Sequence, residues 1–250
     1  MTNKQEKLIR ALYTRQGRKK HNMCICEGLR ACTELAKTRP DLISFALKSE
    51  KFKITEDLKS LEFTTIPENE FRKISATVTS QGIMIIAERP QIKSVEKKEN
   101  RQYALVLDKV ADPGNMGTII RTAKAAGLKN IYITSGSADP FADKVIRAAM
   151  AAQFAVDIIK FANLAEAVCE LRNSGYNTFW KTDPHNGKSL YKTDDLFANS
   201  AIIIGGEASG VSDHPDCKSV TIPMPGNSES INAAQAATIF MFEAVRREGN

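Results

Sequence analysis

Three stretches of the 250-residue sequence combine glycines with polar side chains, and each follows an apolar run of strand length. Glycine lets a ligand or another backbone approach closely, and an arginine fork can hold a phosphate through two hydrogen bonds. A glycine-rich turn can also surround a small ligand with backbone N–H and C=O groups. The stretches are residues 108–121, with Asn115, Gly117 and Arg121; residues 202–210, with Gly205, Gly206, Glu207 and Gly210; and residues 221–232, with Ile222, Met224, Ser230, Ile231 and Asn232.

The first two stretches also have a purely structural explanation, whereas the third is more elaborate than a connector needs. Several familiar catalytic motifs are missing. Asn115 is a good N-cap for the helix that follows it, and Glu207 could cap a tight turn. The sequence has no Gly-x-Gly-x-x-Gly fingerprint for NAD and no Gly-x-Ser-x-Gly elbow of a hydrolase. His21, His185 and His214 are too scattered for a metalloenzyme, so we expect no metal.

Strand and helix patterns alternate through the second part of the chain. This alternation predicts an α/β fold with a mostly parallel sheet and helices on both faces. Ligands of such sheets bind at the loops that leave the carboxyl ends of the strands, which is where the three stretches lie. The expected strands are residues 103–107, 130–134, 157–161, 178–181, 201–205 and 220–222, and the expected helices are residues 116–126, 141–151, 164–173 and 231–247.

The first part of the chain has the pattern of a smaller α/β domain. Its expected strands are residues 23–26, 42–47 and 82–87, and its expected helices are residues 28–37 and 67–75. Residues 93–101 are polar and carry mixed charges without apolar periodicity, so we expect a linker there. The chain should therefore consist of a domain of residues 1–92, the linker 93–101 and a domain of residues 102–250.

The net charge of +6 is concentrated at the N-terminus. Residues 1–20 contain seven basic side chains and one acidic side chain, whereas the rest of the chain is neutral. A basic arm of this kind binds an anion, either nucleic acid or a membrane surface. The alternative is a solvated and partly frayed terminus. The charge alone favours neither interpretation.

Composition excludes several other classes of protein. The hydrophobic content of 42% and the charged content of 26% are those of a globular chain. No apolar run reaches the ~18 residues of a spanning helix, and the N-terminus has no secretory signal. We therefore expect a cytoplasmic protein that does not span a membrane. The odd number of cysteines, five, favours small buried hydrophobic residues over a disulfide framework.

Taken in order, the three stretches resemble the SpoU/TrmH group of SPOUT methyltransferases, over about residues 101–250. The resemblance rests on Asn-x-Gly-x-x-x-Arg at 115–121, Ile-Ile-Ile-Gly-Gly-Glu-x-x-Gly at 202–210, and Ile-Pro-Met with Ser-Ile-Asn at 222–232. The first part resembles the substrate-binding domain often attached to this group, through Glu27-Gly28-Leu29-Arg30 and Thr79-Ser80-Gln81-Gly82. That domain is similar to small ribosomal RNA-binding proteins.

The resemblance implies a fold, a cofactor and a reaction. The parallel sheet would carry a C-terminal trefoil knot, an exception to the rule that chains are unknotted. S-adenosylmethionine would bind in the knot of a homodimer whose site lies near the subunit interface. A methyl group would pass to a ribose 2′-hydroxyl of RNA, and the attached domain favours ribosomal RNA over transfer RNA.

The resemblance also implies roles for individual residues. Asn115 and Arg121 match the polar catalytic pair of the family, with Ser230 and Asn232 facing them, and Glu207 completes the implied catalytic set. The positions implied to hold the cofactor are Thr182, Gly205, Gly206, Gly210, Ile222, Met224 and Ile231.

The proton of the ribose hydroxyl needs an acceptor, and the three stretches contain no histidine or cysteine. A guanidinium has a pKa above ~12 and is no simple base. Our hypothesis is that Arg121 clamps the target phosphate, while the phosphate or solvent takes the proton. The alternatives are a transfer-RNA 2′-O-methyltransferase, a base-methylating relative, or an RNA-binding protein that has lost the activity. The absent glycine fingerprint disfavours a nucleotide-dependent oxidoreductase.

Overall fold

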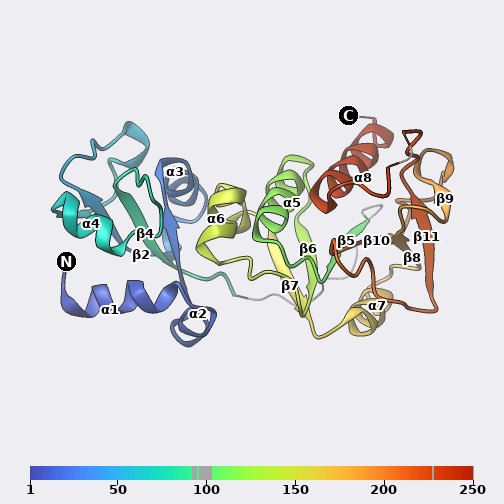
Figure 1. Ribbon diagram of the computed structural model, residues 1–250, viewed down its shortest axis with the longest axis horizontal. Helices are drawn as coiled ribbons and strands as arrows, with labels where there is room; N and C mark the ends of the chain where they lie inside the picture. Colours follow the sequence, from blue (N-terminus) through green and yellow to red (C-terminus); the bar gives the residue numbers. More distant parts are fainter. Residues whose placement is uncertain (92–94, 96–102, 227, 250) are drawn as a thin grey trace. The chain divides into compact units, whose positions relative to one another are not determined.

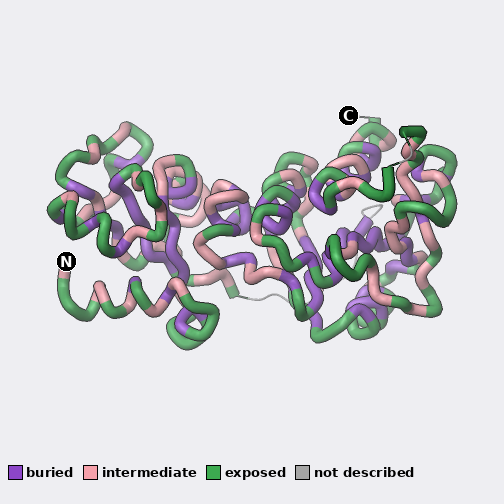
Figure 2. The backbone as a smooth tube through the Cα atoms, viewed as in Figure 1, coloured by how far each residue is buried: buried purple, intermediate pink, exposed green. Residues whose placement is uncertain are grey.

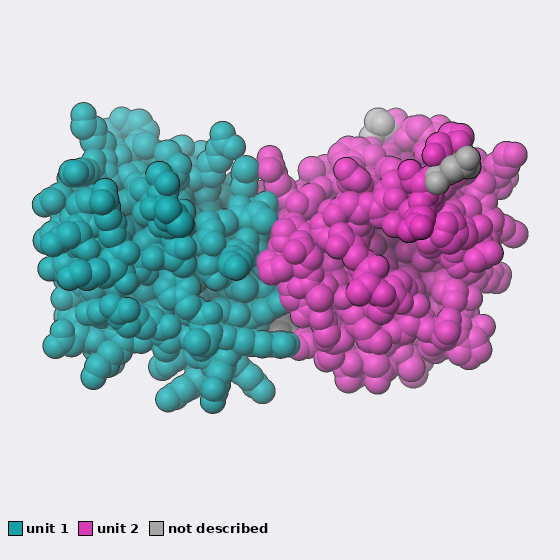
Figure 3. All heavy atoms as spheres, in the orientation of Figure 1, with its two compact units in different colours: residues 1–91, 139–155 teal, residues 92–138, 156–250 magenta. Residues whose placement is uncertain are grey.

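The computed structural model describes residues 1–91, 95, 103–226 and 228–249. These residues form two compact units (Figure 3). Unit 1 comprises Met1–Gln91 together with Asp139–Ala155, and unit 2 comprises Ile92–Ala138 and Val156–Asn250. Apart from Val95, the expected linker 93–101 lies outside the described residues.

Unit 1 is a small α/β domain built on a four-stranded sheet of order β1-β4-β2-β3 (Figure 1). Strand β4 pairs antiparallel with β1 and β2, and β2 pairs parallel with β3. The expected elements of the first part are present, and α1, α2 and β3 are additional to them. The elements are α1 (Asn3–Leu12), α2 (Arg15–His21), β1 (Met23–Glu27), α3 (Leu29–Thr38), η1 (Pro40–Leu42), β2 (Ile43–Ser49), η2 (Glu56–Leu58), β3 (Phe63–Ile66), α4 (Glu68–Ile74) and β4 (Ile83–Glu88).

The basic arm is folded onto this unit as helices α1 and α2. Thr2 caps α1 in a capping box with Gln5. Ile9 and Leu12 lie three residues apart on one face of α1, and both are buried in the core beside Ile25 of β1. The arm is therefore ordered, and the alternative of a frayed terminus is wrong.

Residues Asp139–Ala155 belong to unit 1, although the sequence places them inside the second part of the chain. Asp139 Oδ2 accepts a hydrogen bond of 2.8 Å from Arg18 Nε, and both side chains of this ion pair are nearly buried. Phe141 and Ile146 pack into the cluster that contains Cys24 and Cys26. The segment holds α6 (Asp143–Ala149) and η3 (Ala152–Phe154).

Helix α6 is shorter than the expected helix of residues 141–151. Met150 and Ala151 both adopt left-handed backbone conformations, with φ of 50° and 62°. Successive residues in that region end a right-handed helix. Asp143, in turn, is the first residue with helical geometry.

The cysteines divide by environment. Cys24, Cys26 and Cys32 are buried in unit 1, which confirms that they behave as small hydrophobic residues. Burial raises the pKa of Cys24 to about 12, so its thiol stays neutral at physiological pH. The same expectation is wrong for Cys169, which is exposed on a helix of unit 2.

Unit 2 confirms the predicted parallel sheet, with the order β7-β6-β5-β10-β8-β11-β9 and parallel pairing throughout. The central strands β5 and β10 are buried almost end to end (Figure 2). The strands are β5 (Ala104–Asp108), β6 (Asn130–Thr134), β7 (Asp157–Phe161), β8 (Thr178–Thr182), β9 (Lys188–Ser189), β10 (Ser200–Gly205) and β11 (Cys217–Thr221). The helices are α5 (Pro113–Ala125), α7 (Leu164–Asn173), η4 (Leu190–Lys192) and α8 (Ala233–Arg247).

Helices cover both faces of this sheet (Figure 1). Leu164 and Val168 of α7 pack against Ala104 and Val106 of β5. Successive side chains of a strand point to opposite faces, so Leu105 of β5 points to the other face. Helices α5 and α8 pack against each other, and α8 also packs on β10.

The order of the strands brings the three glycine-containing stretches together at the carboxyl ends of the strands. Strands β5 and β10 are neighbours in register, with Gly205 opposite Asp108. Strands β8 and β11 follow on the other side of β10. The loops that leave β5, β10 and β11 therefore emerge close together.

Candidate functional site

Asn115, Glu207 and Asn232 form a closed set of hydrogen bonds at the carboxyl ends of these strands. Asn115 Nδ2 donates to Glu207 Oε1 at 2.7 Å, and Asn232 Nδ2 donates to the same oxygen at 2.9 Å. Asn232 Nδ2 also lies 2.8 Å from Asn115 Oδ1. One residue comes from each of the three stretches, so their side chains meet in space.

The start of α5 positions Asn115. The N-cap of α5 is Asp112, whose Oδ1 accepts a hydrogen bond of 2.8 Å from the backbone N–H of Asn115. Pro113 occupies the first helical turn, where a missing N–H costs nothing. The expectation that Asn115 itself caps the helix is wrong. Because Asp112 does the capping, the Asn115 amide is available for Glu207 and Asn232.

Asn232 has two roles at the start of α8. Its Oδ1 accepts hydrogen bonds from the backbone N–H groups of Ala234 and Gln235, at 2.9 and 3.3 Å, so it is the N-cap. Its Nδ2 remains to donate to Asn115 and Glu207. The cap therefore fixes the direction of the amide.

Two glycines allow the turn that carries Glu207. A Cβ atom on Gly205 would lie 2.2 Å from the carbonyl carbon of Gly210, and one on Gly206 would lie 2.3 Å from the backbone oxygen of Lys109. Any side chain at either position would displace backbone. These glycines are therefore explained by close approach between the turn and its neighbours.

Asp108, at the end of β5, holds both ends of that turn and was not singled out from the sequence. Its backbone oxygen accepts a hydrogen bond of 3.0 Å from Gly206 N–H, and its Oδ2 accepts one of 2.7 Å from Ser212 N–H. Its Oδ1 accepts a further bond of 2.7 Å from the hydroxyl of Thr134. The side chain is fully buried. An aspartate that ends an otherwise apolar strand is the signal that could have identified it.

A cavity of about 440 Å³ lies beside the three-residue set, and this is the volume range of small-molecule sites. Its walls include apolar side chains, among them Ile204 and Phe240. Glu207, Ser230 and Asn232 also line it. All the residues expected to hold a cofactor line this cavity: Thr182, Gly205, Gly206, Gly210, Ile222, Met224 and Ile231.

Asp183 and Pro184 also line the cavity, although the sequence interpretation did not name them. Partial burial raises the pKa of Asp183, but backbone N–H bonds from His185 and Asn186 and the nearby charge of Lys181 outweigh it, so the net shift is downward. Asp183 therefore carries a negative charge beside the cavity. It follows β8 directly, and the rule that ligands bind after strands could have identified it.

Arg121 lies outside this arrangement. It is exposed on α5, does not line the cavity, and makes no hydrogen bond or ion pair with any residue in the described ranges. Arg121 follows Asn115 by six positions, which corresponds to about 600° of helical rotation. The two side chains therefore point in directions about 120° apart around the helix axis. The structure brings Asn115 to Asn232, and places Arg121 on a different face of the helix.

The described residues contain neither a metal-ligand cluster nor a membrane-spanning helix. No three histidine, cysteine, aspartate or glutamate side chains within those ranges gather as a metal site would require. None of the helices there has the length and apolar character needed to cross a bilayer.

Comparison with known protein families matches each part of the chain to a described family. Residues 102–242 match the model of the SpoU rRNA methylase family. Residues 3–85 match the model of an MRM3-like substrate-binding domain.

Named relatives extend over almost the whole chain. The chain is 31% identical over 245 residues to the 23S rRNA (guanosine(2553)-2′-O)-methyltransferase RlmP of Bacillus subtilis, covering 96% of this chain and 95% of the relative. It is 28% identical to the human mitochondrial rRNA methyltransferase 3, covering 94% of this chain and 70% of that protein.

Solved structures match the fold over its full length. An AdoMet-bound rRNA methyltransferase from Sinorhizobium meliloti superposes with a TM-score of 0.83 at 26% identity, covering 98% of this chain and 95% of that one. A putative RNA methyltransferase of the TrmH family from Porphyromonas gingivalis gives a TM-score of 0.81 at 29% identity, covering 99% of both chains.

Proposed function

The chain belongs to the SpoU rRNA methylase family, and we propose that it transfers a methyl group from S-adenosylmethionine to a ribose 2′-hydroxyl of RNA. The observation that carries this proposal is the hydrogen-bonded set of Asn115, Glu207 and Asn232 beside a cavity built on a glycine turn. The ribosomal-RNA relatives favour ribosomal RNA as the substrate.

The cavity suits S-adenosylmethionine. Apolar walls such as Ile204 and Phe240 can pack on an adenine face, and exposed backbone near Gly205, Ile222 and Ile231 offers partners to its polar edge. The carboxylates of Asp183 and Glu207 suit a ligand that carries positive charge. When bound, this cofactor supplies a methyl group on a sulfonium, which an oxygen nucleophile can accept directly.

The residues of the chain then have to position the hydroxyl and manage its proton. Glu207 Oε1 already accepts two amide hydrogen bonds, so its role is to orient Asn115 and Asn232. Among the described residues that line the cavity there is no histidine or cysteine to act as a base. We infer that the proton passes to the target phosphate or to solvent, since Glu207 Oε1 and Asp183 Oδ1 already accept two hydrogen bonds each from their own chain, and that Arg121 clamps that phosphate.

The exposed position of Arg121 supports a homodimer as the active form. An arginine that does not reach the cavity of its own chain can serve a site near a subunit interface. Helix α8, which packs beside α5, exposes 47% of Phe242, and an exposed aromatic side chain is common at interfaces. The trefoil knot and the cytoplasmic location stay predictions.

Unit 1 is the proposed RNA-binding part, and the basic arm supplies its positive charge. Lys4 and Lys7 of α1 and Arg15, Lys19 and Lys20 of α2 are exposed, and none forms an ion pair within the described part of the chain. These charges are therefore not neutralised by the described residues and are available to an external anion. The match to a substrate-binding domain supports RNA over a membrane.

The test is an incubation of the purified protein with labelled S-adenosylmethionine and RNA from cells that lack it. We expect label in ribosomal RNA, and a nucleoside digest should place the methyl group on ribose. Label in transfer RNA would change the substrate, and label on a base would change the reaction. RNA binding without transfer would identify an inactive relative.

A further inference from the structure

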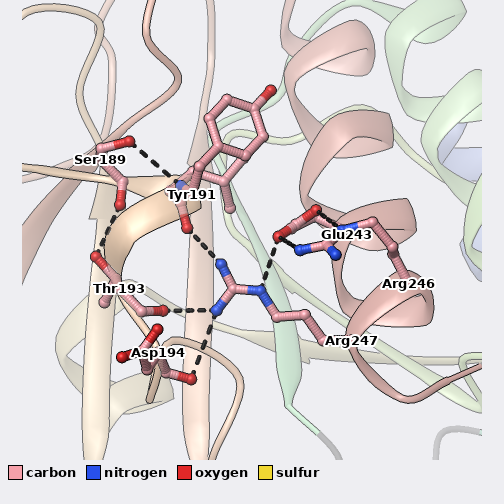
Figure 4. Close-up of polar contacts among 8 residues, drawn as sticks. Ser189, Tyr191, Thr193, Asp194, Glu243, Arg246 and Arg247 are labelled. Carbon is pink, nitrogen blue, oxygen red and sulfur yellow. Dashed lines mark hydrogen bonds and ion pairs between the residues drawn. The ribbon is translucent and has the colours of Figure 1, made fainter.

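Arg247, at the end of α8, donates hydrogen bonds to the segment of residues 190–194 (Figure 4). Its Nη2 donates to the backbone oxygen of Leu190 at 2.6 Å, and its Nη1 donates to that of Thr193 at 2.6 Å. Nη1 also lies 3.5 Å from the backbone oxygen of Asp194. One guanidinium thus satisfies carbonyl groups at the end of the short helix η4.

Glu243 orients this guanidinium. Its Oε1 accepts a hydrogen bond of 2.8 Å from Arg247 Nε, and its side chain is only 7% exposed. Hydrogen bonds from Arg246, followed by those from Arg247, lower the pKa of Glu243 to about 2 against the opposing effect of burial. The carboxylate therefore stays charged at neutral pH. The centre of the Phe197 ring lies 5.3 Å from the carbon of the Arg247 guanidinium, so the aromatic ring also contacts this group.

The chain that leads to this segment begins at the cavity. Asp183 and Pro184 line the cavity immediately after β8. Asp183 N–H donates to the backbone oxygen of Val220 at 3.0 Å, and the hydroxyl of Thr221 donates to that of Pro184 at 3.2 Å. Between those contacts and Arg247, the only strand pairing described is that of β9 with β11, two residues long.

Strand β11 in turn leads to Ile222 and Met224, which form another part of the cavity wall. Helix α8 has its first turns at the cavity, through Ala233 and Ala236, and its last turn at the held segment. Helix α8 thus contributes to the cavity lining at its start and, at its end, holds residues 190–194, which follow Asp183 and Pro184 in the chain. A residue in the last turn can therefore affect a site lined by the first.

We propose that Arg247 is a positioning residue for the cofactor cavity, acting as a clasp that holds residues 183–194 against α8. This inference rests on the proposed function. Arg247 and Glu243 lie beyond residues 102–242, so the matched family model does not include them. The clasp keeps Asp183 and Pro184 in place and slows escape of the bound cofactor.

Arg247→Ala and its neighbour Arg246→Ala form a matched pair of variants. Both remove one positive charge from Glu243, since both arginines bond to it at 2.8 Å. Only Arg247 contacts the carbonyl groups of the segment. Arg247→Lys keeps the charge but not the fork, so it should give an intermediate result.

The first measurement is amide hydrogen exchange without cofactor. We expect exchange at residues 185–194 to be faster in Arg247→Ala than in the wild type, and unchanged in Arg246→Ala. Equal exchange in the wild type and Arg247→Ala would overturn the clasp. If Arg247→Ala does not fold, Arg247→Lys is compared with the wild type in the same way, with faster exchange expected and equal exchange again overturning the clasp.

The second measurement is calorimetric titration with S-adenosylmethionine. We expect Arg247→Ala to weaken binding by about tenfold, comparable to losing one charged hydrogen bond from the wall, with Arg246→Ala close to wild type. Equal affinity of both variants would overturn the positioning role. A wild type that binds no S-adenosylmethionine would overturn the proposed function, whereas the exchange measurement would still decide whether the clasp exists.

Discussion

The side-chain amide of Asn232 lies 2.8 Å from Oδ1 of Asn115, although 117 positions separate the two residues in the chain. The contact exists because β5 and β10 are neighbours in the sheet and β11 lies two strands beyond β10. The loops after these strands therefore converge. Each residue sits at the start of a helix, α5 or α8, so helix capping sets the geometry of the pair.

Asn115→Ala should lower the turnover number by about a hundredfold, the loss expected when substrate alignment is disturbed. Affinity for S-adenosylmethionine should change little, because Asn115 does not line the cavity. Single-turnover kinetics and calorimetry measure the two effects separately. Asn173→Ala, on the exposed end of α7, is the control. Loss of cofactor binding in Asn115→Ala would instead assign Asn115 to the cofactor.

Arg121→Lys should lower turnover by about tenfold or more, because an ammonium cannot form the two parallel bonds of a guanidinium. Stability should not change, since Arg121 is exposed and has no partner within the described ranges. The measurement is the turnover number at saturating RNA, together with the unfolding midpoint. Nearly full turnover would rule out the phosphate clamp.

Asp108→Asn should reduce turnover, because it disturbs the turn that carries Glu207. Asp108 accepts hydrogen bonds on both carboxylate oxygens, from Thr134 and from Ser212. Asparagine offers one oxygen, so its NH₂ group faces either the Ser212 N–H, which is a donor, or the Thr134 hydroxyl, whose proton then loses its acceptor. A buried unsatisfied donor costs about 1–3 kcal/mol.

Ser137→Ala is the matched control for Asp108→Asn. It removes a neighbouring buried hydrogen bond, 3.3 Å long, to the backbone oxygen of Leu107, and it does not touch the turn. Turnover and the free energy of unfolding should both fall for Asp108→Asn, whereas Ser137→Ala should lose stability only. Equal turnover in the two variants would remove Asp108 from the positioning network.

Neutralising α2 with Arg15→Gln, Lys19→Gln and Lys20→Gln should weaken RNA binding and flatten its salt dependence. The log–log slope should fall by roughly 0.7 to 0.9 for each RNA phosphate that the protein no longer neutralises, with cofactor affinity unchanged. Filter binding at several salt concentrations measures the slope. Deletion of the arm is a poor test, because it also removes buried Ile9 and Leu12.

Lys51→Gln with Lys53→Gln is the control for these substitutions. Both lysines are exposed in unit 1, and neither has an ion pair within the described residues. Their neutralisation should leave the salt slope close to wild type. A slope that falls equally for both sets would show that α2 has no particular role in RNA binding.

Asp139→Asn should destabilise the protein by about 3–5 kcal/mol, the cost of leaving one charge of a buried pair without its partner. Arg18 and Asp139 have side chains only 5% and 10% exposed. The exposed pair of Arg10 with Glu6 is the control, and Glu6→Gln should cost at most about 1 kcal/mol. Urea unfolding measures both. Equal effects would mean that the buried pair does not stabilise unit 1.

Some of this arrangement could be predicted from the sequence. Strong apolar patterns predicted β6, β7 and α7 at the residues where the structure has them. Helices α1 and α2 were not predicted, because the segment is strongly charged. Only Ile9 and Leu12 of α1 provide a buried apolar spacing there. Local patterns describe an element well when its own residues provide the periodicity.

The site was predictable as a set of loops, but its internal geometry was not. The position of Asp183 directly after β8 marks it as a candidate, but only the strand order shows that it shares a cavity with Gly205 and Ile222, and no local pattern reveals strand order. Asn115 and Arg121 belong to one motif, yet helical rotation separates them. The sequence motifs therefore predicted which loops form the site, whereas only the tertiary structure shows which of their side chains contact one another.

The packing of Asp139–Ala155 on unit 1 has a consequence for how such proteins change over time. The chain passes between the units at residues 138–139 and 155–156 as well as between residues 91 and 103. A gene fusion that replaced only the N-terminal domain would leave Phe141 and Ile146 without the core that covers them. The N-terminal domain therefore cannot be replaced independently of residues 139–155. An exchange of this domain that preserves the core requires matching changes in those residues.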